Sequence, residues 1–191
     1  MTAPLAAALP GLDSTPAAPI TVRRLSASEA AANVAALADV LIDCVHGGAS
    51  VSFMAPLPRD KALAFWRGVA DGVARNERVL LVAEDAGGTI VGIVQLITAM
   101  PDNQPHRADV AKMLVHRRAR RQGIAQQLMA AVDDAARSEA KTVLVLDTVT
   151  GGDAERLYER AGWQRVGVVP HYALMPDGAL CGTTFFCKGL G

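Results

Sequence analysis

The sequence predicts an α/β (α+β) domain, a mixed sheet of about seven strands with four helices. Within the stretch 109–137 the spacing of apolar residues changes from that of a strand to that of a helix. A strand, a helix and another strand follow one another between 109 and 148, which implies a parallel pair. Two apolar runs, 78–84 and 90–99, are joined by the turn signal Asp-Ala-Gly-Gly-Thr and should pair antiparallel.

The N-terminal part of the domain contributes one strand and two helices. The strand is expected at 20–25. Ser26 or Ser28 can cap the helix that follows, which ends at Gly47-Gly48. A second helix is expected from about 59 to 76. The later strands are expected at 78–84, 90–99, 109–115, 142–148, 163–169 and 183–188, with helices opening near 123 and 153.

The composition is that of one soluble domain. The chain has 191 residues, of which 51% are hydrophobic, enough for a substantial core across 20–191. Residues 1–19 are rich in Ala and Pro and contain no Lys or Arg, so a flexible tail is expected and a signal peptide is not. No apolar run approaches the roughly 18 residues that span a bilayer, which predicts a cytoplasmic protein.

The charge pattern and the cysteines argue against several partners. Lys and Arg number 19, as do Asp and Glu, and aromatic residues make up only 4%. A nucleic-acid binder needs a basic field or stacking aromatics, so neither nucleic acid nor a membrane is expected as a partner. Cys44, Cys181 and Cys187 lack metal-ligand spacing and have no paired histidines nearby, which predicts reduced thiols and no metal.

An anion site is predicted where the central strand passes into a helix. The turn Arg120-Arg121-Gln122-Gly123-Ile124-Ala125 precedes backbone N–H groups that have no intrahelical partner and carry the positive end of the helix dipole. Gly123 allows a ligand to approach the backbone, Ala125 keeps the next position small, and the two arginines add positive charge. On these six residues alone, a solvated basic turn is at least as good an interpretation.

Arg-x-x-Gly-x-Ala at 120–125 resembles the pyrophosphate-binding signature of the GNAT acetyltransferase superfamily, Gln/Arg-x-x-Gly-x-Gly/Ala. The predicted order of elements from Ile20 to the C-terminus is similar to that family as well. The resemblance implies the GNAT acyl-CoA N-acyltransferase fold, acetyl-CoA as the donor and an amine as the acceptor. Backbone N–H groups near Met113, Leu114 and Val115 would then serve the pantetheine arm and the thioester oxygen.

Further stretches resemble a tabtoxin-resistance branch of that family. They are Val45-His-Gly-Gly-Ala-Ser-Val51, 107–115, Leu146-Asp-Thr148 and 165–170. This resemblance implies a small acceptor, amino-acid-like or toxin-like, and a role in detoxification or antibiotic resistance.

Two aspartates are candidates for deprotonating the acceptor. An amine is an ammonium near neutral pH and must lose a proton before it attacks a thioester. Asp109 opens the central strand and Asp147 ends its expected parallel neighbour, so each can face the seam where these strands separate. The resemblance suggests a glutamate at the first position, so the shorter Asp109 favours a bridging water. A solvated strand end and a loop-fixing acceptor are the structural alternatives.

Tyr158 is the candidate for protonating the leaving thiolate. It lies in Leu157-Tyr-Glu-Arg-Ala-Gly-Trp163, which matches the family's motif on the helix after Asp147. The resemblance therefore implies a general acid at Tyr158. A core residue on an amphipathic helix is the alternative.

The segment 46–54, called the lip here, has the sequence His-Gly-Gly-Ala-Ser-Val-Ser-Phe-Met. Its residues are small and flexible except for Phe53 and Met54, which suits a loop folding over a ligand. His46, Ser50 and Phe53 are its candidate acceptor contacts, although an ordinary connector fits the composition equally well.

These features predict an acetyl-CoA-dependent N-acetyltransferase for a small-molecule amine, active as a monomer or homodimer. Acetylation of a protein or peptide amine is the alternative among enzymes. A non-catalytic acyl-CoA sensor is the alternative outside enzymes. Retention of Asp109, Asp147 and Tyr158 together argues against the sensor, because binding alone needs none of them.

Overall fold

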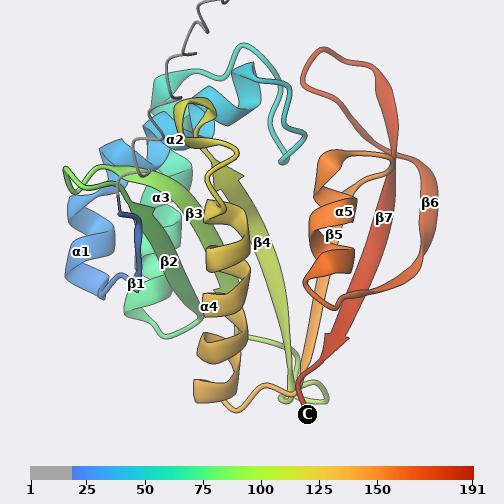
Figure 1. The fold of residues 1–191 in the computed structure, drawn as a ribbon. Coiled ribbons are helices and arrows are strands. Elements are labelled where there is room, and N and C mark those ends of the chain that lie inside the picture. The colour runs from blue at the N-terminus through green and yellow to red at the C-terminus, as the bar shows by residue number, and fades with distance from the viewer. Residues whose placement is uncertain (1–18) are drawn as a thin grey trace, which may run out of the picture.

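The computed structural model describes residues 19–191, so the expected tail at 1–19 lies outside the described residues except for Pro19. The chain forms one seven-stranded sheet in the order β1-β2-β3-β4-β5-β7-β6, with helices on both faces (Figure 1). Among the described strands only β4 and β5 pair in parallel, which confirms the predicted mixed sheet. The strands are β1 (Thr21–Arg24), β2 (Arg78–Glu84), β3 (Ile90–Ile97), β4 (Arg107–Val115), β5 (Val143–Val149), β6 (Gln164–Leu174) and β7 (Leu180–Gly189).

Residues 19–191 contain five α-helices, one more than predicted. They are α1 (Ala27–Ala32), α2 (Val34–His46), α3 (Arg59–Ala74), α4 (Ile124–Ser138) and α5 (Asp153–Arg160), with a short 3₁₀ turn, η1 (Arg117–Ala119). The expected first helix is two helices because Asn33 ends α1, where its backbone and its side-chain amide both donate to the Glu29 carbonyl. Ser26 caps α1 in a capping box with Glu29. None of these helices is both long and apolar enough to cross a bilayer.

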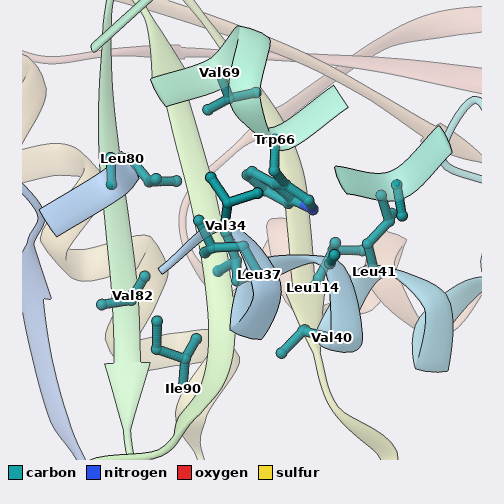
Figure 2. Close-up of a cluster of buried hydrophobic side chains, with 14 of the residues drawn as sticks. Val34, Leu37, Val40, Leu41, Trp66, Val69, Leu80, Val82, Ile90 and Leu114 are labelled. Atoms are coloured by element: carbon teal, nitrogen blue, oxygen red, sulfur yellow. The ribbon is translucent and has the colours of Figure 1, made fainter. Parts of the chain in front are cut away.

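Two apolar clusters cover the two faces of the sheet. On one face α2 and α3 pack on the strands, and Figure 2 shows Trp66 of α3 close to Leu37 of α2 and Leu114 of β4. On the other face Leu128 and Val132 of α4 pack against the sheet, in a cluster that also contains residues of α5. Each such fully buried side chain contributes about 1.5–3 kcal/mol. The sheet between these layers is the rigid frame that holds the site.

The C-terminal hairpin is longer than predicted. The expected strands, 163–169 and 183–188, are β6 and β7 at Gln164–Leu174 and Leu180–Gly189. β6 continues past Pro170 because it is the edge strand, where a proline can remove an N–H without breaking the interior ladder. The ladder is irregular between Val169 and Ala173, which accommodates this proline. The predicted turn at 176–178 is where the two strands join.

Candidate active site

β4 and β5 pair over only three residues and then diverge. Arg107, Ala108 and Asp109 face Val143, Leu144 and Val145 in parallel register, and no later residue of β4 pairs with β5. β5 continues to pair with β7 as far as Val149. We call residues 110–115 and 146–149 the β4–β5 seam (Figure 1). Along the seam the facing edges of the two strands leave backbone N–H and C=O groups without a ladder partner.

A bulge in β4 turns the strand away from β5. The register against β3 moves from Gln95 opposite Ala111 to Ile93 opposite Leu114, so β4 has an extra residue here. Lys112 lies within it and adopts a left-handed conformation with φ 53°. Such bulges bend the strand that carries them. The seam is therefore a product of the backbone at Lys112.

The predicted anion turn lies at the start of α4. Gly123 is the residue before the helix, with φ 75° and no side chain capping the first turn. A Cβ at Gly123 would meet no atom within 4 Å, so the space in front of the helix is open. Arg120, Arg121 and Gln122 are exposed directly before it, and Ala125 is half-buried in the first turn behind Ile124, which is buried. Backbone donors and two guanidinium groups thus surround an open space suited to an anion.

The neighbouring arginines are engaged elsewhere. Arg117 donates to Asp43 from its backbone and from its side chain, at 2.8 and 2.9 Å. Arg118 lies 3.5 Å from Asp85. Arg120 is exposed as a residue and donates from Nε to the Val115 carbonyl at 3.2 Å. Arg117 and Arg118 therefore pair with carboxylates, whereas Arg120 does not.

Met113, Leu114 and Val115 run along the seam between the bulge and the anion turn. Leu114 is buried against α2 and α3, while Met113 and Val115 pack toward α4. Their side chains are therefore committed to the core. Only their backbone faces β5, which fits the predicted use of backbone groups.

The two candidate carboxylates emerge on one face of the sheet. Ala108 and Val110 of β4 and Leu144 and Leu146 of β5 belong to the cluster under α4. Side chains alternate between faces along a strand, so Asp109 and Asp147 face the opposite side, toward α2, α3 and the lip. The two aspartates thus share a face of the sheet, and Asp109 pairs with Val145, two residues before Asp147.

The surroundings of the two carboxylates differ. Asp109 is half-buried, and its carboxylate is ion-paired with the Arg107 guanidinium, which Gln104 also holds at 2.7 Å. Asp147 is reached by solvent, yet its carboxylate has lost part of its hydration, which raises its pKa. The positive charge of Lys112 opposes this rise, and the negative charge of Asp109 adds to it. Sequence reasoning treated the two alike. Asp147 is the carboxylate better suited to accept a proton.

Tyr158 lies on the other face of β5. It is 6% exposed, and its ring packs beside Trp163 and Phe186, with ring centres 6.1 and 5.8 Å away. Burial raises its pKa to about 12, and the charge of Asp147 adds to this rise. The phenol therefore keeps its proton at neutral pH. A core position and a role as proton donor are compatible here.

The lip is fastened to the rest of the chain. Ser50 donates to the Leu174 carbonyl at 3.0 Å, and the Ala55 amide donates to the Pro176 carbonyl at 3.0 Å. The lip and the β6–β7 turn therefore meet. Phe53 packs edge-on to Phe65 of α3, with 5.3 Å between ring centres.

His46, the third candidate of the lip, has a local contact. It lies at the end of α2, and its Nε2 accepts a hydrogen bond from the Leu57 amide at 3.2 Å. The ring also lines a cavity of about 150 Å³ with Gly48, Ala55 and Met175. The imidazole therefore holds the loop beyond the lip.

We call the face of the sheet that carries Asp109 and Asp147 the acceptor face. Three residues of this face were missed by the sequence analysis. Lys112 donates to Ser52 of the lip at 3.2 Å. Phe185 of β7 lies directly opposite Asp147 and so shares its face, and Tyr172 packs edge-on to Phe185 at 5.7 Å. A lysine within the apolar run from Val110 to Val115 was a signal available for Lys112. Nothing in the local sequence distinguishes Phe185 and Tyr172.

The arrangement matches a known domain. Residues 76–165, from the turn before β2 to the start of β6, match the family model of the acetyltransferase (GNAT) domain. This segment is therefore similar to a GNAT acetyltransferase domain. An uncharacterized N-acetyltransferase in the hisH-hisA intergenic region of Azospirillum brasilense is 34% identical to this chain over 113 residues. That match covers 58% of this chain, and the chain spans 65% of the length of that relative.

Solved structures agree with the GNAT fold. A ribosomal-protein-alanine N-acetyltransferase from Brucella melitensis superposes with a TM-score of 0.75 at 22% identity, covering 89% of this chain and 99% of that one. A GNAT superfamily phosphinothricin acetyltransferase from Sinorhizobium meliloti, in complex with AcCoA, has a TM-score of 0.75 at 16% identity, covering 90% and 89%. The predicted GNAT fold is therefore confirmed. Across residues 19–191 no group of three or more His, Cys, Asp or Glu side chains is placed to hold a metal.

Proposed function

We propose that this protein is an acetyl-CoA-dependent N-acetyltransferase that acts on a small amine. The observation that carries the proposal is the β4–β5 seam, with an anion site at one end and Asp147 and Tyr158 on its two faces. The phosphate-bearing end of an acyl donor needs the anion site, and its thioester needs a base and an acid beside it. The GNAT domain match and the relative bound to AcCoA support the same donor.

The start of α4 holds the donor's pyrophosphate in this proposal. Arg120, Arg121 and the backbone of 122–125 supply cationic and amide donors, and Gly123 leaves the approach open. The backbone groups of Met113 to Val115 that do not pair with β3 then hold the pantetheine arm and the thioester oxygen along the seam. A preorganised amide donor at a developing oxyanion is worth about 3–4 kcal/mol.

Asp147 takes a proton from the acceptor's ammonium, directly or through one water. The free amine then forms a bond to the thioester carbon, and the carbon–sulfur bond breaks. Tyr158 donates its proton to the departing sulfur from the other face of β5, and the second proton of the attacking nitrogen leaves as the amide forms and restores the phenol. This reaction needs a base and an acid. The Asp147 carboxylate, with its raised pKa, is the base, and the Tyr158 phenol, which is protonated at neutral pH, is the acid.

Asp109 has a supporting part in this mechanism. Its pairing with Arg107 keeps the carboxylate charged and fixed at the point where the strands separate. From there it raises the pKa of Asp147 and so makes Asp147 a stronger base. Both side chains are shorter than glutamate, which leaves room for a water molecule between them.

The lip supports a small acceptor over a peptide. The bond from Ser50 to Leu174, and that from the adjoining Ala55 to Pro176, join it to the β6–β7 turn across the end of the acceptor face. A peptide would need that end open. Ser50 and Phe53 accordingly border the acceptor, whereas His46 acts through the loop that it holds.

The stretches that resemble the tabtoxin-resistance branch include the lip, β4 and the end of β5. These are the segments that form the acceptor face. The resemblance thus supports an amino-acid-like or toxin-like acceptor and a role in detoxification. It belongs to the proposal together with the donor and the reaction.

The test is release of free thiol from acetyl-CoA in the presence of a panel of amines, with mass spectrometry of the acetylated product. Turnover of at least one small amine, lowered about 10²-fold or more in the Asp147→Asn variant, is the expected result. Turnover of peptides but of no small amine would favour the peptide alternative. Tight acetyl-CoA binding with no turnover of any amine would favour the sensor.

A further inference from the structure

Lys112 is the cation of the acceptor face. It lies in the β4 bulge with φ 53°, a backbone conformation that costs a non-glycine residue about 1–3 kcal/mol and tends to occur at functional sites. The side chain is half-buried. Its contacts with Ser52 of the lip and Phe65 of α3 direct it to the face that carries Asp109 and Asp147.

The Lys112 ammonium lacks an anion at contact distance. Among residues 19–191 its hydrogen-bond partner is the neutral Ser52 hydroxyl at 3.2 Å, and the Phe65 ring centre lies 5.7 Å away. Lys112 makes no ion pair with a carboxylate of the described residues, and Asp147 acts on it only through its charge. Burial lowers the pKa of Lys112 from its ordinary value.

Lys188 shows how the same chain treats another lysine removed from water. Its ammonium lies 2.6 Å from Asp133 and 2.7 Å from the Ala161 carbonyl. Charged groups that leave water are normally paired in this way. Lys141, also half-buried, donates to the carbonyls of Thr98 and Pro105. Among residues 19–191 Lys112 is therefore the half-buried lysine with the fewest polar partners.

We propose, on the basis of the proposed function, that Lys112 binds a carboxylate of the acceptor, so that the acceptor is an amino acid or a close analogue. Its ammonium lies on the same face as Asp147, and the two charges are separated rather than paired. The ammonium group of such an acceptor meets Asp147, and its carboxylate meets Lys112. An anion in contact with Lys112 also restores the stabilisation that its burial removed.

The experiment compares matched acceptors that differ only in the carboxylate. Glycine, β-alanine and γ-aminobutyrate are each assayed beside their carboxamides, with acetyl-CoA and thiol release, at equal concentrations of free amine. The proteins are wild type, Lys112→Met, which removes the charge and keeps the length, and Ser52→Ala. The last removes the hydrogen bond to Lys112 and keeps its charge.

For at least one pair we expect wild type to favour the carboxylate in kcat/KM by roughly ten- to hundredfold, the value of a hydrogen bond between charged groups. Lys112→Met should lose most of this preference, and the loss should appear as a higher KM for the carboxylate. Ser52→Ala should retain the preference. Equal losses for both members of each pair would overturn the proposal, because Lys112 would then serve the fold or the base. Wild-type rates that do not distinguish carboxylate from carboxamide would also overturn it.

A binding measurement separates this inference from the reaction itself. The N-acetyl forms of the same probes are titrated into the CoA-bound protein by calorimetry. A carboxylate preference in wild type that is lost in Lys112→Met supports the site even if no amine is acetylated. Absence of thiol release would count against the proposed function, whereas equal affinity for the N-acetyl acids and amides would count against the role of Lys112.

Discussion

The Asp109 carboxylate is ion-paired with Arg107, two residues earlier on the same strand. Asp147 has no comparable cation in contact among the described residues, and its pKa is raised by lost hydration. Two aspartates that look equivalent in the sequence are thereby given different chemistry.

Asp147→Asn should lower kcat/KM at neutral pH by about 10²-fold or more, because the variant cannot accept the ammonium proton. A base must be deprotonated, so wild-type activity should fall as the pH drops through a value above the ordinary aspartate range. Raising the pH should rescue part of the variant's rate, since more of the acceptor is then free amine. The measurement is a pH–rate profile of both proteins. Parallel profiles would mean that Asp147 only positions the acceptor.

The same substitution should not destabilise the protein. A carboxyl group whose pKa is raised on folding favours the folded state in its neutral form, so that stability falls as the pH rises through this pKa. Asn is neutral throughout. We expect Tm of Asp147→Asn at pH 7 to equal or slightly exceed that of wild type, with the difference shrinking in acid. A large loss of Tm would show that the carboxylate fixes the loop, as in the structural alternative.

Asp109→Asn should slow the reaction less than Asp147→Asn, because Asp109 acts on the base rather than on the amine. It should also shift the acid limb of the pH profile to lower pH, since it removes a charge that raises the pKa of Asp147. The double variant should lose less than the product of the two single losses, because the residues act as a unit. Multiplicative losses in kcat/KM would mean that the two aspartates act independently.

Tyr158→Phe should lower kcat by about 10²-fold while acetyl-CoA binding is retained. The phenylalanine ring keeps the contacts with Trp163 and Phe186, so Tm should change little. An acetyl thioester with a more acidic thiol needs less protonation as it leaves. The loss should therefore be smaller with that donor, and an equal loss with both donors would return Tyr158 to a purely structural role.

Gly123→Val should weaken acetyl-CoA binding by about 10²-fold or more in calorimetric titration, because its side chain occupies the open approach to the helix start. Gly88 provides a matched control. It has the same φ of 75°, and a Cβ placed on it would likewise meet no atom within 4 Å, but it lies in the β2–β3 turn. Gly88→Val therefore carries a similar backbone strain and should leave acetyl-CoA affinity unchanged. Similar affinities for both variants would put the pyrophosphate elsewhere.

Local sequence patterns determined most of the fold of this protein. Apolar periodicity places the strands and helices within a few residues, and Asp85 with Gly88 specifies the β2–β3 turn through bonds within five residues. The open turn at Gly123 is likewise local, since it needs only a glycine before a helix. Such features depend on neighbours along the chain, so they can be recognised without the fold. The break at Asn33 was missed because helical spacing continues across it.

Contacts between distant segments decided the chemistry. The separation of β4 from β5 depends on a bulge at Lys112, which is defined by its register against β3. The different states of Asp109 and Asp147 come from what surrounds each carboxylate in space, and Phe185 meets Asp147 only because β7 inserts between β5 and β6. The lip meets the β6–β7 turn across more than a hundred residues of sequence. A pKa, an unpaired charge and a docked loop are set by the groups packed around them, and only the tertiary structure brings those groups together.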